Sequence, residues 1–279
     1  MKVNNITINN YELSYLDQGA GEPLILVHGS LSDYRSWEKQ IGEFSKRYRT
    51  IAISLRHCFP EIWDGSNGSF SIRQHVADLL EFIKKLSLPK AHILGHSRGG
   101  AVVLKLICEH TDLFRSAILV DPAPFIKLFG SDPSMLGEME KRNQFVHESI
   151  KLLHNGDIDK GLELFTDSVS LAGTWRKLPE SAKKIRRANA WSLKSLEADA
   201  KESIEIENLK KLSLHILLLS GQMSPVIYKK MHEKLEEYLP NARKRIVMDA
   251  SHGMHRDNPE SFNNSVLKFL NNFIRLDNS

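Results

Sequence analysis

The 279-residue sequence lacks the features that mark several large classes of protein. Its two cysteines, Cys58 and Cys108, are too few for a disulfide framework, and no short metal-ligand spacing joins them. No apolar run approaches the roughly 18 residues of a membrane span, and the N-terminal segment lacks the apolar stretch of a secretory signal. These absences predict a cytoplasmic protein with no membrane span, no metal site and no structural disulfide.

The chain also has little net charge, because 38 basic residues stand against 34 acidic ones. Such a small excess does not indicate a nucleic-acid partner. The densest basic cluster consists of Lys183, Lys184, Arg186 and Arg187. Such runs of charge are typical of a helix face exposed to solvent, which is the interpretation we favour. The alternative is a contact with an acidic substrate or a membrane surface.

Eight short segments rich in branched apolar residues predict eight strands. They are residues 3–8, 12–16, 23–27, 49–54, 91–95, 116–120, 214–220 and 244–248. Helical patterns separate the later strands, which predicts an α/β fold with a mostly parallel sheet and helices on both faces. Only a short turn around Asn9 and Asn10 joins the first two strands, so we expect an antiparallel hairpin at one edge.

Residues 125–208 break the alternation of strands and helices. This segment contains helical patterns, no convincing strand, and more aromatic and apolar side chains than a simple connection needs. We therefore expect a helical cap over the carboxyl edge of the sheet, inserted after the sixth strand. Residues 1–124 and 209–279 then form the core.

The segment AHILGHSRGG, residues 91–100, carries the strongest chemical signal. A buried strand runs directly into G-x-S-x-G and then into a helical pattern. The turn must be so sharp that side chains on Gly95 and Gly99 would collide, and glycine removes them. Ser97 is thereby presented as a nucleophile at a helix N-terminus, where the backbone N–H of Arg98 faces a developing oxyanion.

A second oxyanion donor is expected at the end of the third strand, in the sequence ILVHGS at residues 25–30. The tight turn after His28 exposes backbone, and the N–H of Ser30, or alternatively that of Leu31, completes the oxyanion hole. Hydrogen bonds from the His28 ring are expected to brace this loop.

A serine hydroxyl becomes a good nucleophile when a neighbouring base takes its proton, and histidine suits that task near neutral pH. His252 lies in a loop directly after the last strand, so it projects at the same sheet edge as Ser97. We therefore predict His252 as the general base. Its rival, His255, is expected to line the pocket.

Three segments together resemble the α/β-hydrolase superfamily, in its branch of helical-capped, esterase-like enzymes. They are HGSLSDYRSW at residues 28–37, GHSRGG at 95–100 and SHGMHRDNP at 251–259. The resemblance implies a serine hydrolase that cleaves a carboxylic ester or related small acyl compound through an acyl-enzyme, without metal or organic cofactor. Amidase, thioesterase and C–C hydrolase activities remain open, whereas serine at the nucleophile position argues against epoxide opening and halide displacement.

The resemblance also implies a triad acid, and here the sequence departs from the usual pattern. Relatives place an aspartate shortly after the seventh strand, as G-x-x-D, where this chain has Ser224. In some relatives the acid comes from the end of the sixth strand, which here reads AILVDPAP and contains Asp121. We therefore expect Asp121 to hold the tautomer of His252 and offset its charge, with Asp249 as the alternative.

Ser224 also keeps a second class of function open, a ligand-binding or receptor-like protein on this fold with little turnover. In either class, the apolar cap favours a hydrophobic group on the ligand. The side chains expected to line its pocket are Leu31, Phe125, Trp175, Trp191 and His255. The sequence carries no signal for an oligomeric state.

Overall fold

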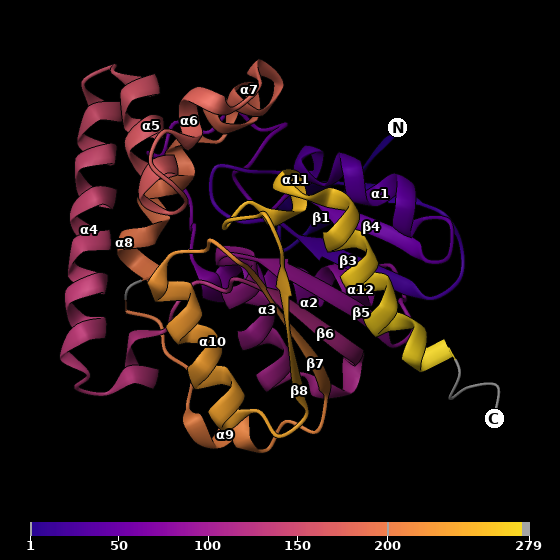
Figure 1. Ribbon diagram of the computed structural model, residues 1–279. Coiled ribbons are helices and arrows are strands. Elements are labelled where there is room, and N and C mark those ends of the chain that lie inside the picture. Colours follow the sequence, from indigo (N-terminus) through magenta and orange to yellow (C-terminus); the bar gives the residue numbers. More distant parts are fainter. Residues whose placement is uncertain (1, 200, 275–279) are drawn as a thin grey trace.

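The computed structural model describes residues 2–199 and 201–274. An eight-stranded sheet runs through the centre of the molecule, in the order β1-β2-β4-β3-β5-β6-β7-β8 (Figure 1). The strands are β1 (Val3–Ile8), β2 (Tyr11–Gln18), β3 (Pro23–Val27), β4 (Arg49–Ile53), β5 (Ala91–His96), β6 (Phe114–Val120), β7 (His215–Gly221) and β8 (Ala242–Val247). Every pair from β4 to β8 is parallel, while β2 pairs antiparallel with β1 and β4. The predicted sheet is confirmed, with strand ends that differ from the expected ones by at most two residues.

The β1–β2 hairpin at the sheet edge is also confirmed. Asn9 and Asn10 form its two-residue turn, with φ angles of 45° and 56°, and Ile8 pairs with Tyr11 across it. A turn with two left-handed residues matches the twist of the flanking strands, and asparagine tolerates that conformation better than most side chains.

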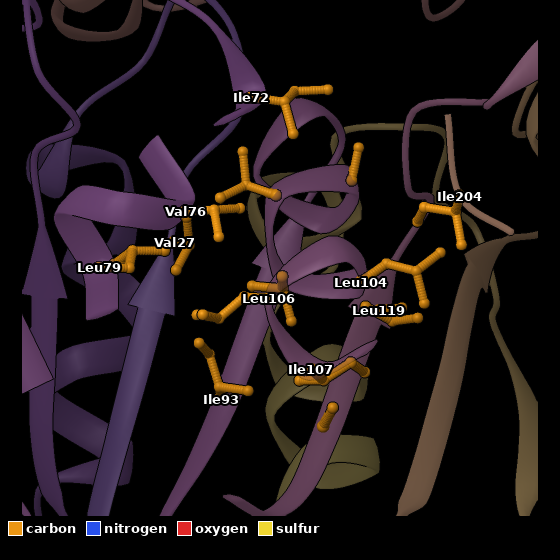
Figure 2. Close-up of a cluster of buried hydrophobic side chains, with 14 of the residues drawn as sticks. Val27, Ile72, Val76, Leu79, Ile93, Leu104, Leu106, Ile107, Leu119 and Ile204 are labelled. Carbon is orange, nitrogen blue, oxygen red and sulfur yellow. The ribbon is translucent and has the colours of Figure 1, made fainter. Parts of the chain in front are cut away.

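Helices cover both faces of the sheet. Successive β3 residues point to opposite faces, with Ile25 in one buried cluster and Leu26 in the other. The cluster of Ile25 contains side chains of α2 (Ile72–Lys85), α3 (Arg98–Glu109) and α10 (Val226–Tyr238). Figure 2 shows part of it, where strand residues meet α2 and α3: Val27, Ile93, Leu119, Val76, Leu79, Leu106 and Ile107. The cluster of Leu26 contains side chains of α1 (Glu38–Phe44) and α12 (Pro259–Ile274).

Between β6 and β7 the described chain forms helices and turns and no strand. The helices α4 to α8 stand together beside the core, at the left and top of Figure 1. The elements of this connection are η3 (Ile126–Phe129), α4 (Pro133–His154), α5 (Ile158–Ser168), α6 (Thr174–Lys177), α7 (Glu180–Ala188), η4 (Ala190–Lys194), α8 (Ser195–Asp199) and α9 (Ile206–Lys210). Side chains of α4, α5, α6, η4 and α8 form a buried cluster, to which the core contributes Leu31, while η3 and α9 contribute to the cluster of Ile25.

Three short helices complete the secondary structure: η1 (Tyr34–Trp37), η2 (Thr111–Leu113) and α11 (Met254–Asp257). Over the described ranges, no helix combines the length and the apolar character needed to cross a membrane.

The turn between β5 and α3 positions Ser97. Its φ of 53° and ψ of −121° lie outside the helical and strand regions, so the turn is strained. A Cβ atom placed on Gly95 would lie 2.4 Å from the carbonyl oxygen of Gly99, and one on Gly99 would lie 2.3 Å from that of His28. Both contacts are with backbone that cannot move aside, so the steric reason for the two glycines holds in the structure.

Replacing Gly99 with alanine is therefore expected to destabilise the protein by about 1–3 kcal/mol or more, the range for overpacking a well-packed core. Urea unfolding measures the change. Gly137→Ala is the matched control, because Gly137 lies exposed in α4 with no atom near the added Cβ. That control should gain about 0.5–1 kcal/mol from the better helix propensity of alanine. Equal stability of the two variants would contradict the steric account of the turn.

Candidate active site

Ser97 lines a pocket at the carboxyl edge of the sheet. Its backbone N–H donates to Val120 at 2.9 Å, and its carbonyl accepts from Ala123 at 2.9 Å, so the turn is fixed to the end of β6. The pocket is also lined by Ser30, Leu31, His96 and His252, among others. We call it the inner pocket. Ser97 and His252, predicted from separate motifs, thus face one cavity.

His252 is held on two sides. Its Nδ1 lies 3.3 Å from Asp121 Oδ2, and its carbonyl oxygen accepts a hydrogen bond from His96 Nε2 at 2.8 Å. Burial lowers the pKa of His96 well below its ordinary value, so its ring is neutral and donates from one nitrogen only. Because Nδ1 of His252 serves Asp121, Nε2 is the nitrogen left for Ser97.

Asp121 lies immediately after β6, fully buried, with a left-handed φ of 39°. Its carboxylate accepts hydrogen bonds from Ser224 Oγ at 2.5 Å, His232 Nε2 at 3.1 Å and His252 Nδ1 at 3.3 Å. Burial alone would raise its pKa, but the hydrogen bonds from His232 and His252 outweigh burial and hold the pKa well below its usual value. Asp121 therefore carries the negative charge that a histidine base needs.

Ser224 occupies the position where the family resemblance predicts an acid, and here it is hydrogen-bonded to Asp121. Its hydroxyl donates to Asp121 and accepts from the N–H of Gly221 at 3.1 Å. The two residues meet because β6 and β7 are parallel neighbours, so their carboxyl ends lie side by side. The rival acid, Asp249, is exposed, and among the described residues no hydrogen bond joins it to His252.

Two site residues on α10 escaped sequence analysis. His232 donates to Asp121, and Tyr228 stacks on the ring of His252 with centroids 4.0 Å apart and planes inclined by 14°. Burial raises the pKa of Tyr228 to about 12, against the opposing charge of Arg142. The sequence does place Tyr228 and His232 on one face of a helix, because they are four residues apart. Nothing in the sequence indicates that this face is the one directed toward Asp121.

The expected oxyanion donors are available. The N–H of Leu31 is engaged by Ser192 Oγ at 3.0 Å, whereas none of the hydrogen bonds between described residues uses the N–H of Ser30. Arg98 is the first residue of α3, so its N–H has no acceptor within the helix. This arrangement favours Ser30 over Leu31 as the second donor.

His28 fixes the loop that carries Ser30. Its Nε2 accepts from the N–H of Leu55 at 3.0 Å, so its Nδ1 carries the proton and donates to Gly29 O at 2.8 Å. Burial lowers the pKa of His28 to about 4, which keeps the ring neutral and this tautomer in place.

The side chain of Arg98 leaves the inner pocket and binds the helical connection instead. Its guanidinium forms an ion pair with Asp199 of α8 and a hydrogen bond of 2.7 Å with His75 Nδ1. Asp199 also accepts from the N–H of Ile72, the first residue of α2, at 3.1 Å. One carboxylate therefore ties α8 to the starts of α2 and α3.

Of the side chains expected to line the pocket, only Leu31 does so. Phe125 is buried in the sheet core, Trp175 is buried among the helices of the connection, and the ring of Trp191 is tilted against that of His154 with centroids 5.0 Å apart. His255 is buried, with Nε2 3.0 Å from Nη1 of Arg256. These four rings pack against other elements, and other residues of the connection form part of the pocket wall: Phe165, Thr166, Val169, Ser170, Thr174 and Leu178.

The basic cluster also departs from expectation. Arg187 lies at the surface in ion pairs with Asp159 and Glu180, as a solvated face would have it. Arg186 is buried, with 8% of its surface exposed, and lines the inner pocket.

Comparison with known proteins gives the same fold. A non-heme chloroperoxidase, CPO-A1 of Kitasatospora aureofaciens, is 25% identical over 285 residues, covering 95% of this chain and 98% of its own. A 2-hydroxy-6-oxo-6-(2'-aminophenyl)hexa-2,4-dienoic acid hydrolase of Metapseudomonas resinovorans is 22% identical over 273 residues, covering 95% and 89%. The structure of carboxylesterase CesB from Bacillus subtilis superposes with a TM-score of 0.74 at 19% identity, covering 96% and 91%. The alpha/beta hydrolase fold family model matches residues 22–259, from the start of β3 to the start of α12, and the protein therefore belongs to the α/β-hydrolase fold family.

Proposed function

We propose that this protein is a serine hydrolase that cleaves a carboxylic ester or a related small acyl compound. One observation carries the proposal: Ser97 and His252 line the same pocket, and His252 Nδ1 lies 3.3 Å from the buried carboxylate of Asp121. Nucleophile, base and acid are thus supplied from the ends of β5, β8 and β6. The relatives carry different activities on one fold, so the reaction class rests on this geometry rather than on their names.

The chemistry follows from these positions. His252 Nε2 takes the proton of Ser97 Oγ as the oxygen attacks the acyl carbon, and Asp121 stabilises the imidazolium that forms. The backbone N–H groups of Ser30 and Arg98 hold the oxyanion. As the tetrahedral intermediate collapses, the bond to the leaving alcohol breaks and His252 gives that alcohol the proton. Water then attacks the acyl-enzyme, with His252 as base, and releases the acid and free Ser97.

The helices α4 to α8 act in this proposal as a cap, within residues 125–208. This segment provides much of the inner pocket wall, including Phe165, Val169, Thr174 and Leu178, while the core provides Ser97. A wall of medium-sized side chains excludes water from the acyl group more completely than an open edge of sheet, which strengthens the electrostatic contacts inside.

The nucleophile is tested with an activity probe. A fluorophosphonate should label the wild-type protein covalently, and Ser97→Ala should lose both labelling and hydrolysis of p-nitrophenyl esters, because Ser97 faces the same cavity as the proposed base His252. Intact-protein mass spectrometry measures the labelling. A wild-type protein that neither reacts with the probe nor turns over any ester would favour the ligand-binding alternative.

The acid is tested by a matched pair of amide variants. Asp121→Asn should lower kcat by about 10⁴-fold, because an amide does not hold the required tautomer of the histidine. Asp249→Asn should leave kcat within about twofold, since that side chain is exposed at the surface. Steady-state kinetics with p-nitrophenyl butyrate measures both, and a larger loss in Asp249→Asn would move the acid to that residue.

The position of Ser224 allows a rescue. Its Oγ lies 2.5 Å from Asp121 Oδ2, so a carboxylate introduced by Ser224→Asp lies close to the site of the lost charge. In the Asp121→Asn background, Ser224→Asp should recover at least tenfold in kcat, about 1.4 kcal/mol. Ser224→Asn in the same background is the control of equal size and should recover nothing. Equal kcat values for the two double variants would show that charge from the end of β7 does not reach His252.

A further inference from the structure

Arg186 is an unusual residue to line a pocket for an ester, because its side chain is a cation. It lies on α7 beside Lys183, Lys184 and Arg187, which reach the surface, yet it is buried and faces the same cavity as Ser97 and His252. Its one hydrogen bond within the described chain runs from Nη1 to the carbonyl of Ala182, one turn earlier in its own helix, at 3.2 Å. A guanidinium has five N–H donors, so most of the hydrogen-bonding capacity of Arg186 is unused.

Arg256 is a second guanidinium at this site, four residues after His252. Its Nη1 donates to the neutral ring of His255 at 3.0 Å, and its Nε is buried without a hydrogen-bond partner. A Cβ atom placed on Gly253 would lie 2.7 Å from Arg256 Nη2, so the absence of a side chain beside His252 leaves room for this group. His255, expected to line the pocket, instead orients Arg256.

The two charges lie close enough to act on each other. Burial lowers the pKa of Arg186 well below its ordinary value, and the charge of Arg256 lowers it further, while Asp257 opposes the shift. Over residues 2–199 and 201–274, no salt bridge joins either guanidinium to a carboxylate. Asp257, the acid that acts on both, is exposed and accepts from the N–H of Ser251 at 3.0 Å. One carboxylate thus faces two guanidinium groups, and one positive charge has no counterpart.

Such an arrangement is costly unless a ligand completes it. A buried charge such as that of Arg186 destabilises a folded protein when it has no partner, and the charge of the half-buried Arg256 nearby adds repulsion. Arg256 borders not only the inner pocket but also a wider cleft that shares Ser170 and Thr174 with it. A substrate entering through the cleft therefore meets Arg256 before it reaches Arg186 in the inner pocket.

We propose that Arg186 and Arg256 form a subsite for a carboxylate carried by the substrate, so that the protein hydrolyses an ester bearing a second, free carboxylate. The inference rests on the proposed function and names its substrate class. A single uncompensated positive charge matches a monoanion better than a phosphate dianion, and the planar guanidinium fork suits the two oxygens of a carboxylate. Holding that end of the substrate orients the ester carbonyl toward Ser97.

Paired substrates that differ in this charge test the proposal. Monomethyl glutarate and dimethyl glutarate have the same acyl chain, and only the first carries a carboxylate. After correction for the two ester groups of the diester, the wild-type kcat/KM should favour the hemiester at least tenfold, about 1.4 kcal/mol. Monomethyl succinate and monomethyl adipate, each with its diester, repeat the comparison at other distances. The same kcat/KM for hemiester and diester at all three lengths would overturn the subsite.

Charge-removing variants locate the effect. Arg186→Gln and Arg256→Gln should each reduce the ratio of hemiester to diester kcat/KM at least tenfold. Arg187→Gln is the matched control, because this neighbouring arginine is engaged in surface ion pairs, and it should keep the wild-type ratio. A ratio unchanged in Arg186→Gln, or lowered equally in Arg187→Gln, would contradict the assignment.

Two further readouts separate this inference from the proposed function and from a structural role. Calorimetry with Ser97→Ala protein should show monomethyl glutarate binding at least tenfold more tightly than dimethyl glutarate, whether or not any ester is turned over. Failure of ester turnover and probe labelling would reject the hydrolase, whereas equal binding of the two esters would reject the subsite.

Thermal unfolding tests a structural role of Arg186. Arg186→Gln should have a Tm no lower than that of the wild type, because it removes an unpaired buried charge. A clearly lower Tm would make Arg186 a structural residue.

Discussion

The buried carboxylate of Asp121 is the constraint on which the site depends. It lies after the end of β6 and receives hydrogen bonds from three directions: from His252 after β8, from His232 in α10, and from Ser224 after β7. An ionised carboxylate without partners would be intolerable at this depth, and three donors make it favourable. The same bonds that stabilise the charge also fix the loop and helix that carry His252 and Tyr228 around Ser97.

In the proposed site the acid lies after β6, whereas the family resemblance predicts it after β7, and parallel pairing explains how one position can serve for the other. Neighbouring parallel strands are about 4.8 Å apart, so carboxylates at their two ends reach nearly the same point. The position after β7 holds Ser224, whose hydroxyl donates a hydrogen bond to the carboxylate of Asp121. A serine there is thus a consistent partner of Asp121, and the departure from the usual motif does not itself indicate a binding protein without turnover.

The parts of the site that could be predicted from sequence are those fixed by short segments of the chain. One turn sets the positions of Ser97 and its glycines, and His252 and Asp121 follow the ends of strands. The sequence pattern and the order of the strands were therefore enough to predict where these three residues lie. The pocket wall depends on how amphipathic helices rotate against one another. An aromatic ring such as that of Trp175 can pack in a core or line a pocket, and composition does not distinguish the two. Arg186 and Arg187 are the same residue type and differ only in their position on α7, so composition could not show that one is buried and the other at the surface.

The guanidinium pair and the triad are linked through charge. In the proposed reaction His252 becomes an imidazolium, and Arg256, packed against the adjacent Gly253, opposes the arrival of a second positive charge nearby. Asp121 would offset part of this repulsion. A substrate carboxylate held by Arg186 and Arg256 would offset more of it, in a low-dielectric pocket where each such contact counts more than in water. A substrate with that carboxylate would then bring part of the electrostatic stabilisation that its own hydrolysis needs, and a neutral ester would lack it.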